Sequence, residues 1–277
     1  MAEPVAHGVN APSVRLAPAK PGEAGMLLVR SFFEWFGEVG LFCGRVAHAA
    51  LARPYEIREL IRQLDEVGSK SVLLVAVAGA AIGVVLSLET RNSLIRFGAE
   101  SSLPAIIIVS IIRETGPTIT GLIVSGRVGA GIGAALGSMK VTDQIDAIEV
   151  SGVNPYHYLA ATRILACALM LPLLTLACDA SGILMGWVVN TLEKPISFRL
   201  FLTIGLKNVT FDDFLPPTFK TIVFGLIIGV VSCFQGMRVT GGTEGVGRAA
   251  TDSVVLSSLF IILADVILVK MILVFFP

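Results

Sequence analysis

The chain has 277 residues, of which 54% are hydrophobic and only 15% are charged, and its mean hydropathy is +0.81. An average soluble domain carries about 25% charged residues, so this composition predicts an integral membrane protein. The 21 basic residues are balanced by 21 acidic ones, and no basic stretch is interleaved with aromatic residues. We therefore expect no nucleic-acid partner.

The N-terminal part of the chain falls into two segments. Residues 1–25 are rich in Pro, Ala and Gly without an apolar stretch and cleavage pattern, which predicts a disordered tail and no signal peptide. Residues 26–70 mix apolar and charged side chains, and no run reaches the ~20 apolar residues that cross a bilayer. They predict amphipathic helices that lie in the membrane interface or pack on the protein's own bundle, ahead of a transmembrane domain at 71–277.

Five later stretches have the apolar length of a membrane span. The second is about 37 residues long, or roughly 55 Å of helix, so it must protrude, tilt or bend. Eight Lys and Arg residues precede the first span, which favours a cytoplasmic N-terminus and, with an odd number of spans, an external C-terminus. Loops 140–157 and 235–252 then face the cytoplasm. The predicted spans are Ser71–Leu88, Leu103–Met139, Leu159–Leu192, Pro217–Phe234 and Val254–Phe276.

The stretch "GRVGAGIGAALGSMK" at 126–140 looks like a phosphate-binding loop but lacks the required spacing. Leu136 stands where a dinucleotide fingerprint needs its third glycine, and the chain contains no G-x-x-x-x-G-K-[ST] sequence. Small residues instead recur every four positions, which predicts close helix packing, within the subunit or across a dimer. The main row is Gly121, Ser125, Gly129, Gly133 and Gly137, beside a second row of Gly126, Ala130, Ala134 and Ser138.

Just upstream, "IIRETGPTITG" places Arg113 and Glu114 inside an apolar segment. A charge there costs at least about 2.5 to 3.5 kcal/mol, so both side chains should face a cavity or a partner. Pro117 follows Gly116 and invites a local break in the helix. The pair is either a polar element of a transport path or a structural ion pair. Weaker candidates of the same kind are Asp179, Lys220, Asp265 and Lys270.

No residue pattern in the sequence indicates a catalytic site or a metal site. The histidines are isolated, and we interpret the four cysteines as small buried hydrophobic residues: Cys43, Cys167, Cys178 and Cys233.

Two loops are candidates for contact with a partner protein. In "KVTDQIDAIEVSGVNP", Thr142 is a plausible N-cap, and Val141, Ile145 and Ile148 form an apolar stripe beside an acidic face. This short amphipathic helix is either a surface connector or a segment that docks into a partner's groove. The loop "GMRVTGGTEGVGRAATDS" is glycine-rich and is either a flexible turn or a second partner contact.

From Met26 to Phe276 the chain resembles the MlaE/YrbE-type permeases, the membrane subunits of ABC transporters that work with MCE proteins. The resemblance rests on four motifs in this order: "RETGP", "GRVGAGIGAALGSMKVTDQIDAIEVSGVNP", "LPLLTL" and "GGTEGVGRAAT". The N-terminal extension and the polar run "SLETRNSLIRFG", with Glu89 and Arg91, depart from the family pattern.

The resemblance implies an all-α integral membrane protein with an N-terminal interfacial helix, five transmembrane helices and a cytoplasmic coupling helix. The coupling helix would be Thr142 to Ser151 and would contact an ATPase through Thr142, Asp143, Ile145, Asp146, Ile148 and Glu149. The substrate cavity would involve the charged residues Arg113, Glu114 and Lys220, and at its outer rim the lining residues Leu86, Leu94 and Phe97.

The implied function is movement of phospholipid or a related lipid between the bacterial inner membrane and a periplasmic MCE-domain protein, which forms a hexameric ring. The implied partners are a cytoplasmic ABC ATPase, a second permease copy and membrane lipid. The chain itself would be no enzyme and hold no cofactor, because the ATPase subunit binds the ATP. The competing hypothesis is a secondary transporter or channel that uses intramembrane Arg, Glu and Asp residues as an ion path. A lipid-modifying enzyme is disfavoured because no nucleophile, base or metal set clusters in the sequence.

Overall fold

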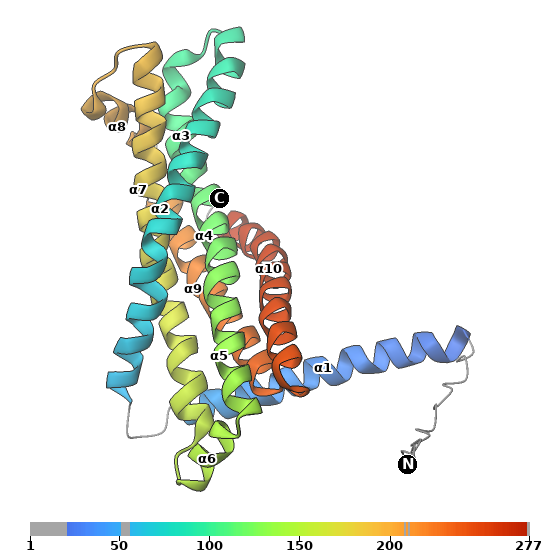
Figure 1. Cartoon of the computed structure of the whole chain (residues 1–277). Helices are drawn as coiled ribbons and strands as arrows, with labels where there is room; N and C mark the ends of the chain where they lie inside the picture. Colours follow the sequence, from blue (N-terminus) through green and yellow to red (C-terminus); the bar gives the residue numbers. More distant parts are fainter. Residues whose placement is uncertain (1–20, 51–55, 208, 210, 276–277) are drawn as a thin grey trace, which may run out of the picture. The chain divides into compact units, whose positions relative to one another are not determined.

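A computed structural model of the chain describes residues 21–50, 56–207, 209 and 211–275 (Figure 1). All regular secondary structure in these ranges is helical. Five of the helices in these ranges are long and apolar enough to cross a membrane, which confirms the predicted all-α membrane architecture. They cover Ile57–Arg96, Glu100–Val141, Tyr156–Glu193, Asp213–Met237 and Gly242–Val274. Most of the tail predicted at 1–25 lies outside the described residues.

The chain divides into two units, residues 1–41 and 42–277. Helix α1 (Pro21–Ala50) begins in the first unit, where Arg30 pairs with Glu34 one turn along. In the second unit, the Phe42 ring packs edge-on against the rings of Tyr156 and Phe234, with centroids 5.9 and 5.6 Å apart. Aromatic packing therefore anchors the last turns of α1 to the helical bundle. Their location in a membrane interface stays a prediction.

The next helix, α2 (Ile57–Arg96), is a single helix of 40 residues. It runs without a break through Lys70 and Ser71, where the sequence suggested a boundary between an interfacial segment and the transmembrane domain. The first turns of α2 are charged but rich in good helix formers, and local pairs such as Arg62–Glu59 (2.7 Å) support them. Hydropathy thus marks the apolar part of α2 but not the start of the helix.

The second span is a composite of α-helical and π-helical segments. It consists of α3 (Leu103–Ser110), a π turn η2 (Ile111–Thr115), α4 (Gly116–Val124), a second π turn η3 (Ser125–Gly129) and α5 (Ala130–Val141). The break expected at Gly116 and Pro117 is the π turn η2, which ends one residue earlier. A proline removes one backbone hydrogen bond, and a π turn accommodates this loss within a continuous helix.

The predicted row of small residues on this span lies against α9 (Phe211–Met237) and α10 (Gly242–Phe275) of the same chain. A Cβ at Gly121 would lie 3.2 Å from Phe224, and one at Gly129 would lie 3.2 Å from the Ser232 hydroxyl. Within the row, the Ser125 hydroxyl lies 3.1 Å from that of Ser258. The structure thus places this row inside the subunit, where small residues let the backbones approach.

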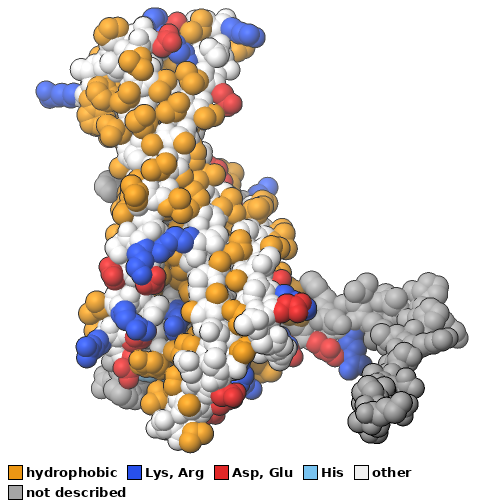
Figure 2. Space-filling view, viewed as in Figure 1, with side chains coloured by type: hydrophobic (Ala, Val, Ile, Leu, Met, Phe, Trp, Pro, Cys, Tyr) orange, Lys and Arg blue, Asp and Glu red, His pale blue; other side chains and the backbone are white. Residues whose placement is uncertain are grey.

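Helix α7 (Thr162–Glu193), preceded by a π turn η4 (Tyr156–Ala161), is the central helix of the bundle. It packs along α2 on one side and along α9 on the other. Two short helices connect the spans at opposite ends of the bundle: α6 (Gln144–Val150) and α8 (Phe198–Leu206) (Figure 1). Figure 2 shows hydrophobic side chains over much of the upper part of the visible face, whereas charged side chains lie at the rim of the α8 end and on the lower half toward α6.

Candidate functional site

The structure brings Glu114, Lys220 and Asp265 together from three separate parts of the chain. Glu114 lies on the π turn η2, Lys220 on α9 and Asp265 on α10. The Lys220 ammonium donates to the Glu114 carboxylate at 2.8 Å and lies 2.9 Å from the Asp265 carboxylate. We call these three residues the lysine cluster. One cation therefore bridges two carboxylates inside the bundle.

Burial differs sharply within the lysine cluster. The Lys220 side chain is 1% exposed and that of Asp265 is 13% exposed, whereas that of Glu114 is 48% exposed. Asp265 also accepts a hydrogen bond of 3.2 Å from the Thr118 hydroxyl on α4. Lys220 and Asp265 therefore form the fixed part of the cluster, and Glu114 is the partner that solvent or a ligand can reach.

The depth of the lysine cluster follows from the helix lengths. Lys220 lies nine residues after the start of α9, and Asp265 lies ten residues before the end of α10. At 1.5 Å per residue, each lies roughly 15 Å along its helix from that end. Both residues are therefore several turns inside helices long enough to cross a membrane, where charged side chains are found paired.

Arg113, the neighbour of Glu114, pairs with a different residue. Its guanidinium lies 2.6 Å from the carboxylate of Asp213 in the first turn of α9. Arg113 and Glu114 are therefore no ion pair with each other, because each has a partner on α9. Asp213 was not among the residues singled out from the sequence, and its position 100 residues downstream gave no local signal of the contact.

A further carboxylate, Asp179 on α7, lies beside the junction of η2 and α4. Asp179 is 7% exposed, and its Oδ1 atom has no hydrogen-bond partner among the described residues. A Cβ atom at Gly116 would collide with that oxygen. Glycine is thus required at position 116 by close approach, and the carboxylate of Asp179 fills the space next to the π turn.

An apolar cavity of about 560 Å³ opens beside the lysine cluster, between α9 and α10. Lys220 is the single ionisable residue among the described residues that line it. The other lining side chains are apolar: Leu215, Pro216, Phe219, Ile222, Val223, Leu268, Met271 and Ile272. The apolar walls of this cavity match the hydrocarbon part of a ligand better than a free ion.

The other predicted cavity residues lie elsewhere. Leu86 and Leu94 on α2 pack against the buried side chains of Leu103, Ile107 and Ile111, and Phe97 is 82% exposed just after α2. None of the three lines the cavity beside Lys220. Their contact with a substrate stays a prediction.

The loop between the second and third spans forms a shorter helix than expected. Thr142 is not an N-cap, because its hydroxyl donates back to the Ser138 carbonyl at 2.9 Å and α5 ends there. Asp143, in the left-handed conformation (φ 55°), precedes α6 instead. Lys140 pairs with Asp146 at 2.7 Å, and Glu149 is exposed.

The apolar side chains of α6 point in different directions. Ile145 is buried in its own chain, Ile148 is half-buried, and Val150 is 90% exposed. Val150 is therefore the apolar side chain of α6 best placed for a partner, and it lies outside the apolar stripe predicted from the sequence.

The cysteines are free thiols that lie outside the lysine cluster. The four cysteines are free, and three of them are buried. Burial raises the pKa of the Cys43 thiol on α1, which makes this thiol less reactive. In the described ranges, no three His, Cys, Asp or Glu side chains come close enough to hold a metal ion.

Comparison with known proteins agrees with this architecture. The family model described as "Permease MlaE" matches residues 60–271. The chain is 33% identical over 240 residues to a "Probable ABC transporter permease protein" of Rickettsia typhi, which covers 87% of this chain and 93% of that protein. It is 32% identical over 208 residues to a protein of the same description from Synechocystis, covering 75% and 79% of the two chains. It is also 31% identical over 239 residues to "Protein TRIGALACTOSYLDIACYLGLYCEROL 1, chloroplastic" of Arabidopsis thaliana, covering 86% and 68%.

The five apolar helices define a multi-pass membrane protein, and the relatives place it in the permease class. The chain belongs to the MlaE permease family.

Proposed function

We propose that the chain is the permease subunit of an ABC transporter that moves phospholipid or a related lipid. The observation that carries this proposal is an apolar cavity of about 560 Å³ whose lining includes Lys220, the buried cation that binds the half-exposed Glu114. Acyl chains match the apolar walls, and an anionic head group matches the ammonium. The printed names of the relatives support an ABC permease, and that of the Arabidopsis relative contains the name of a lipid.

In this mechanism the lipid competes with Glu114 for Lys220. Glu114 is half-exposed and bound to the ammonium at 2.8 Å, whereas Asp265 stays in place through its bond from Thr118. A lipid phosphate that approaches Lys220 therefore displaces Glu114 and leaves Asp265. When the cavity is compressed, Glu114 returns to Lys220 and the lipid leaves, so two states differ in lipid affinity.

The energy for this exchange would come from a cytoplasmic ATPase that contacts α6. In this proposal the permease performs no covalent chemistry of its own, and ATP is bound and hydrolysed in the partner. Val150 and the acidic residues Asp146 and Glu149 belong to the exposed surface of α6. Helix α6 follows α5, whose small residues pack against α9 and α10, so a movement of α6 would act on that packing.

The complete transporter would contain a second permease copy and a periplasmic MCE-domain protein, in the inner membrane of a bacterium. Helix α10 is well suited to contact a second copy or lipid, because only 11% of its apolar 18-residue stretch is buried within the chain.

An ion path through the same charges is the competing function. The carboxylates of Glu114, Asp265 and the buried Asp179 would bind the ion along its path. The apolar cavity beside Lys220 has no role in that mechanism, which is why we favour lipid transport.

The test is ATP-dependent lipid movement from proteoliposomes that contain the chain with its ATPase to an acceptor protein. Val150→Asp should abolish copurification of the ATPase and leave the permease folded, because Val150 is 90% exposed. Lys207→Asp, an exposed position just after α8, is the matched control and should retain the complex. Dissipation of an ion gradient by the purified chain alone, with no ATPase bound, would instead establish the ion path.

A further inference from the structure

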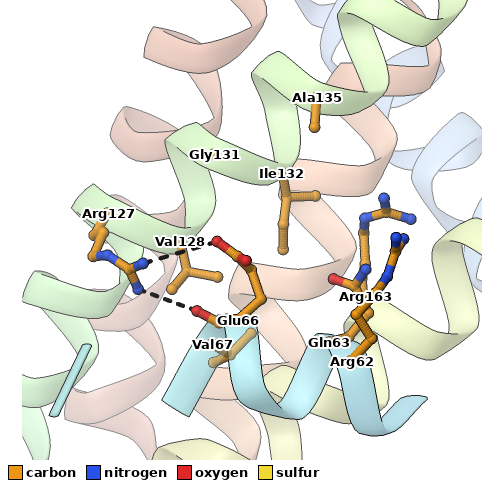
Figure 3. Close-up of a pocket in the computed structure, with 10 residues that line it drawn as sticks. All are labelled: Arg62, Gln63, Glu66, Val67, Arg127, Val128, Gly131, Ile132, Ala135 and Arg163. Carbon is orange, nitrogen blue, oxygen red and sulfur yellow. Dashed lines mark hydrogen bonds and ion pairs between the residues drawn. The ribbon is translucent and has the colours of Figure 1, made fainter. Parts of the chain in front are cut away.

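A second cavity, of about 340 Å³, lies between α2, α7 and the helix formed by η3 and α5 (Figure 3). It shares no lining residue with the cavity beside Lys220. Three arginines line it, Arg62, Arg127 and Arg163, and Glu66 is the one carboxylate among its described lining residues. We call it the arginine cavity. Its lining is therefore cationic, unlike the apolar wall beside Lys220.

The arginines differ in how their charges are paired. Arg127 donates to the Ser71 hydroxyl at 2.5 Å, and its guanidinium lies 4.0 Å from the Glu66 carboxylate. Arg62 pairs with Glu59 at 2.7 Å and is 69% exposed at the mouth. Both of these arginines thus have a carboxylate partner.

Arg163 does not. It is 7% exposed, and its guanidinium donates to the backbone carbonyl of Leu159 at 2.8 Å. No carboxylate in the described part of the chain lies within ion-pair distance of Arg163. Figure 3 shows the guanidinium groups of Arg163 and Arg62 on the same side of the cavity, facing away from Glu66. A buried cation is left without a counter-charge, at a site with room for one.

An anionic ligand would supply the negative charge that Arg163 lacks. Burying an unpaired charge is costly, so a protein retains it where a ligand supplies the opposite charge. The planar guanidinium presents several N–H donors in the geometry that a phosphate group accepts. The opposite wall of the cavity, with Val128 and Ile132, is apolar and suits the carbon skeleton attached to such a phosphate.

The location of the arginine cavity fits the head-group region of a membrane. Arg62 lies five residues after the start of α2, and Arg163 lies seven residues after Tyr156, where the third span begins. Both are therefore about 10 Å from the α6 end of their helices. Basic pockets between membrane spans at this depth are typical sites for anionic lipid head groups.

We propose that the arginine cavity binds a phosphate group, held by Arg163 and Arg62, and that the phosphate belongs to an anionic lipid of the leaflet at the α6 end. Free inorganic phosphate has the same chemistry and is the second possible source. The site is distinct from the lysine cluster and does not depend on lipid transport through it.

Gly131 allows a test that changes no charge. It lines the arginine cavity, and a Cβ there would meet no atom within 4 Å, so Gly131→Leu should direct its side chain into the cavity. Gly126, on the same composite span, also has open space for a Cβ but does not line the cavity. Gly126→Leu is therefore the matched control.

The experiment measures lipid bound to the purified chain in nanodiscs of equal parts phosphatidylcholine and phosphatidylglycerol, by native mass spectrometry. Arg163→Gln should weaken phosphatidylglycerol retention by about tenfold or more, as expected for loss of a charged hydrogen-bond donor. Gly131→Leu should give a similar loss, and Gly126→Leu should match the wild type. If Arg163→Gln fails to fold, Arg62→Gln, at an exposed position, replaces it. All of these variants leave the Lys220 cavity intact, so differences in retention report on the arginine cavity.

Adding inorganic phosphate distinguishes the two sources. If phosphate does not displace phosphatidylglycerol from the wild type, the site takes the lipid head group. If phosphate binds the lipid-free chain and Arg163→Gln and Gly131→Leu abolish this binding, the site takes the free ion. Equal retention of phosphatidylglycerol and equal binding of phosphate by the wild type and both variants would overturn the proposal.

Discussion

The lysine cluster and the arginine cavity are two charged regions of one bundle with opposite charge balance. In the lysine cluster, one buried cation lies between two carboxylates at 2.8 and 2.9 Å. In the arginine cavity, the buried cation Arg163 has a carbonyl oxygen at 2.8 Å and no carboxylate partner among the described residues. A ligand at the first region must therefore displace an internal partner, whereas a ligand at the second adds a missing one.

This difference separates structural stability from ligand binding. The charges of the lysine cluster stabilise the empty protein, so removing the central cation should be destabilising. The charge of Arg163 stabilises only the occupied protein, so removing it should change little until the ligand is added. The following substitutions test this contrast by their effect on the free energy of unfolding, measured in mixed detergent micelles.

Lys220→Met should have the largest effect. It leaves Asp265 buried without a cation, and breaking a buried ion pair from one side costs about 3 to 5 kcal/mol. The measurement is reversible unfolding followed by circular dichroism. Lys270→Met, at an exposed position on the same helix as Asp265, is the control and should change the free energy by less than about 0.5 kcal/mol. If the two variants were equally stable, the ion pairs of the lysine cluster would contribute nothing to the free energy of unfolding.

Gly133→Ala should rank second. Its added Cβ would collide with the Ser253 hydroxyl and come within 2.9 Å of the Ala249 backbone carbonyl on α10, which predicts a loss of about 1 to 3 kcal/mol. Gly131→Ala, two residues earlier, should stabilise the helix by about 0.5 to 1 kcal/mol, because its Cβ enters the open arginine cavity. The same unfolding measurement would contradict this account if both substitutions shifted stability in the same direction.

Glu114→Gln should have a smaller effect on stability. Glu114 is half-exposed, and Lys220 keeps Asp265 as a partner, so we expect a loss below about 1 kcal/mol. Lipid transport by the reconstituted complex should change much more than stability, since Glu114 is the group that competes with the lipid. A large fall in unfolding free energy with normal transport would make Glu114 a structural residue only.

Arg163→Gln should have the smallest effect on the empty protein, within about 0.5 kcal/mol, because the lost hydrogen bond is offset by removal of an unpaired buried charge. Phosphatidylglycerol should then raise the unfolding free energy of the wild type but not of the variant, as expected for a ligand that binds the folded state alone. Equal stabilisation of both proteins by phosphatidylglycerol would contradict the predicted role of Arg163.

The sequence predicted those features that depend on local composition. Five apolar lengths gave five spans, and Gly116 with Pro117 follow directly after the π turn η2, where the α-helical pattern changes. The period of four from Gly121 to Gly137 identified a face that packs closely. These features could be predicted because they follow from residues near one another in the chain.

Contacts between distant residues were not predictable from one sequence. Asp213 is 100 positions from Arg113, and nothing near either residue signals their pairing. The unpaired state of Arg163 likewise became visible only when α2, α5 and α7 were placed around one cavity. The family resemblance assigned Ile145 to a contact with the ATPase, whereas in the structure it is buried within its own chain.

The most direct test of the central claim is the amount of lipid retained by the purified wild type, Glu114→Gln and Lys220→Met proteins, compared by native mass spectrometry under conditions in which all three remain folded. If Glu114 competes with lipid for Lys220, Glu114→Gln should retain more lipid than the wild type, by about fivefold for a competing pair worth about 1 kcal/mol. Lys220→Met should retain less. Equal retention by the three proteins, or a loss of lipid in Glu114→Gln, would contradict the claim that Lys220 holds the head group.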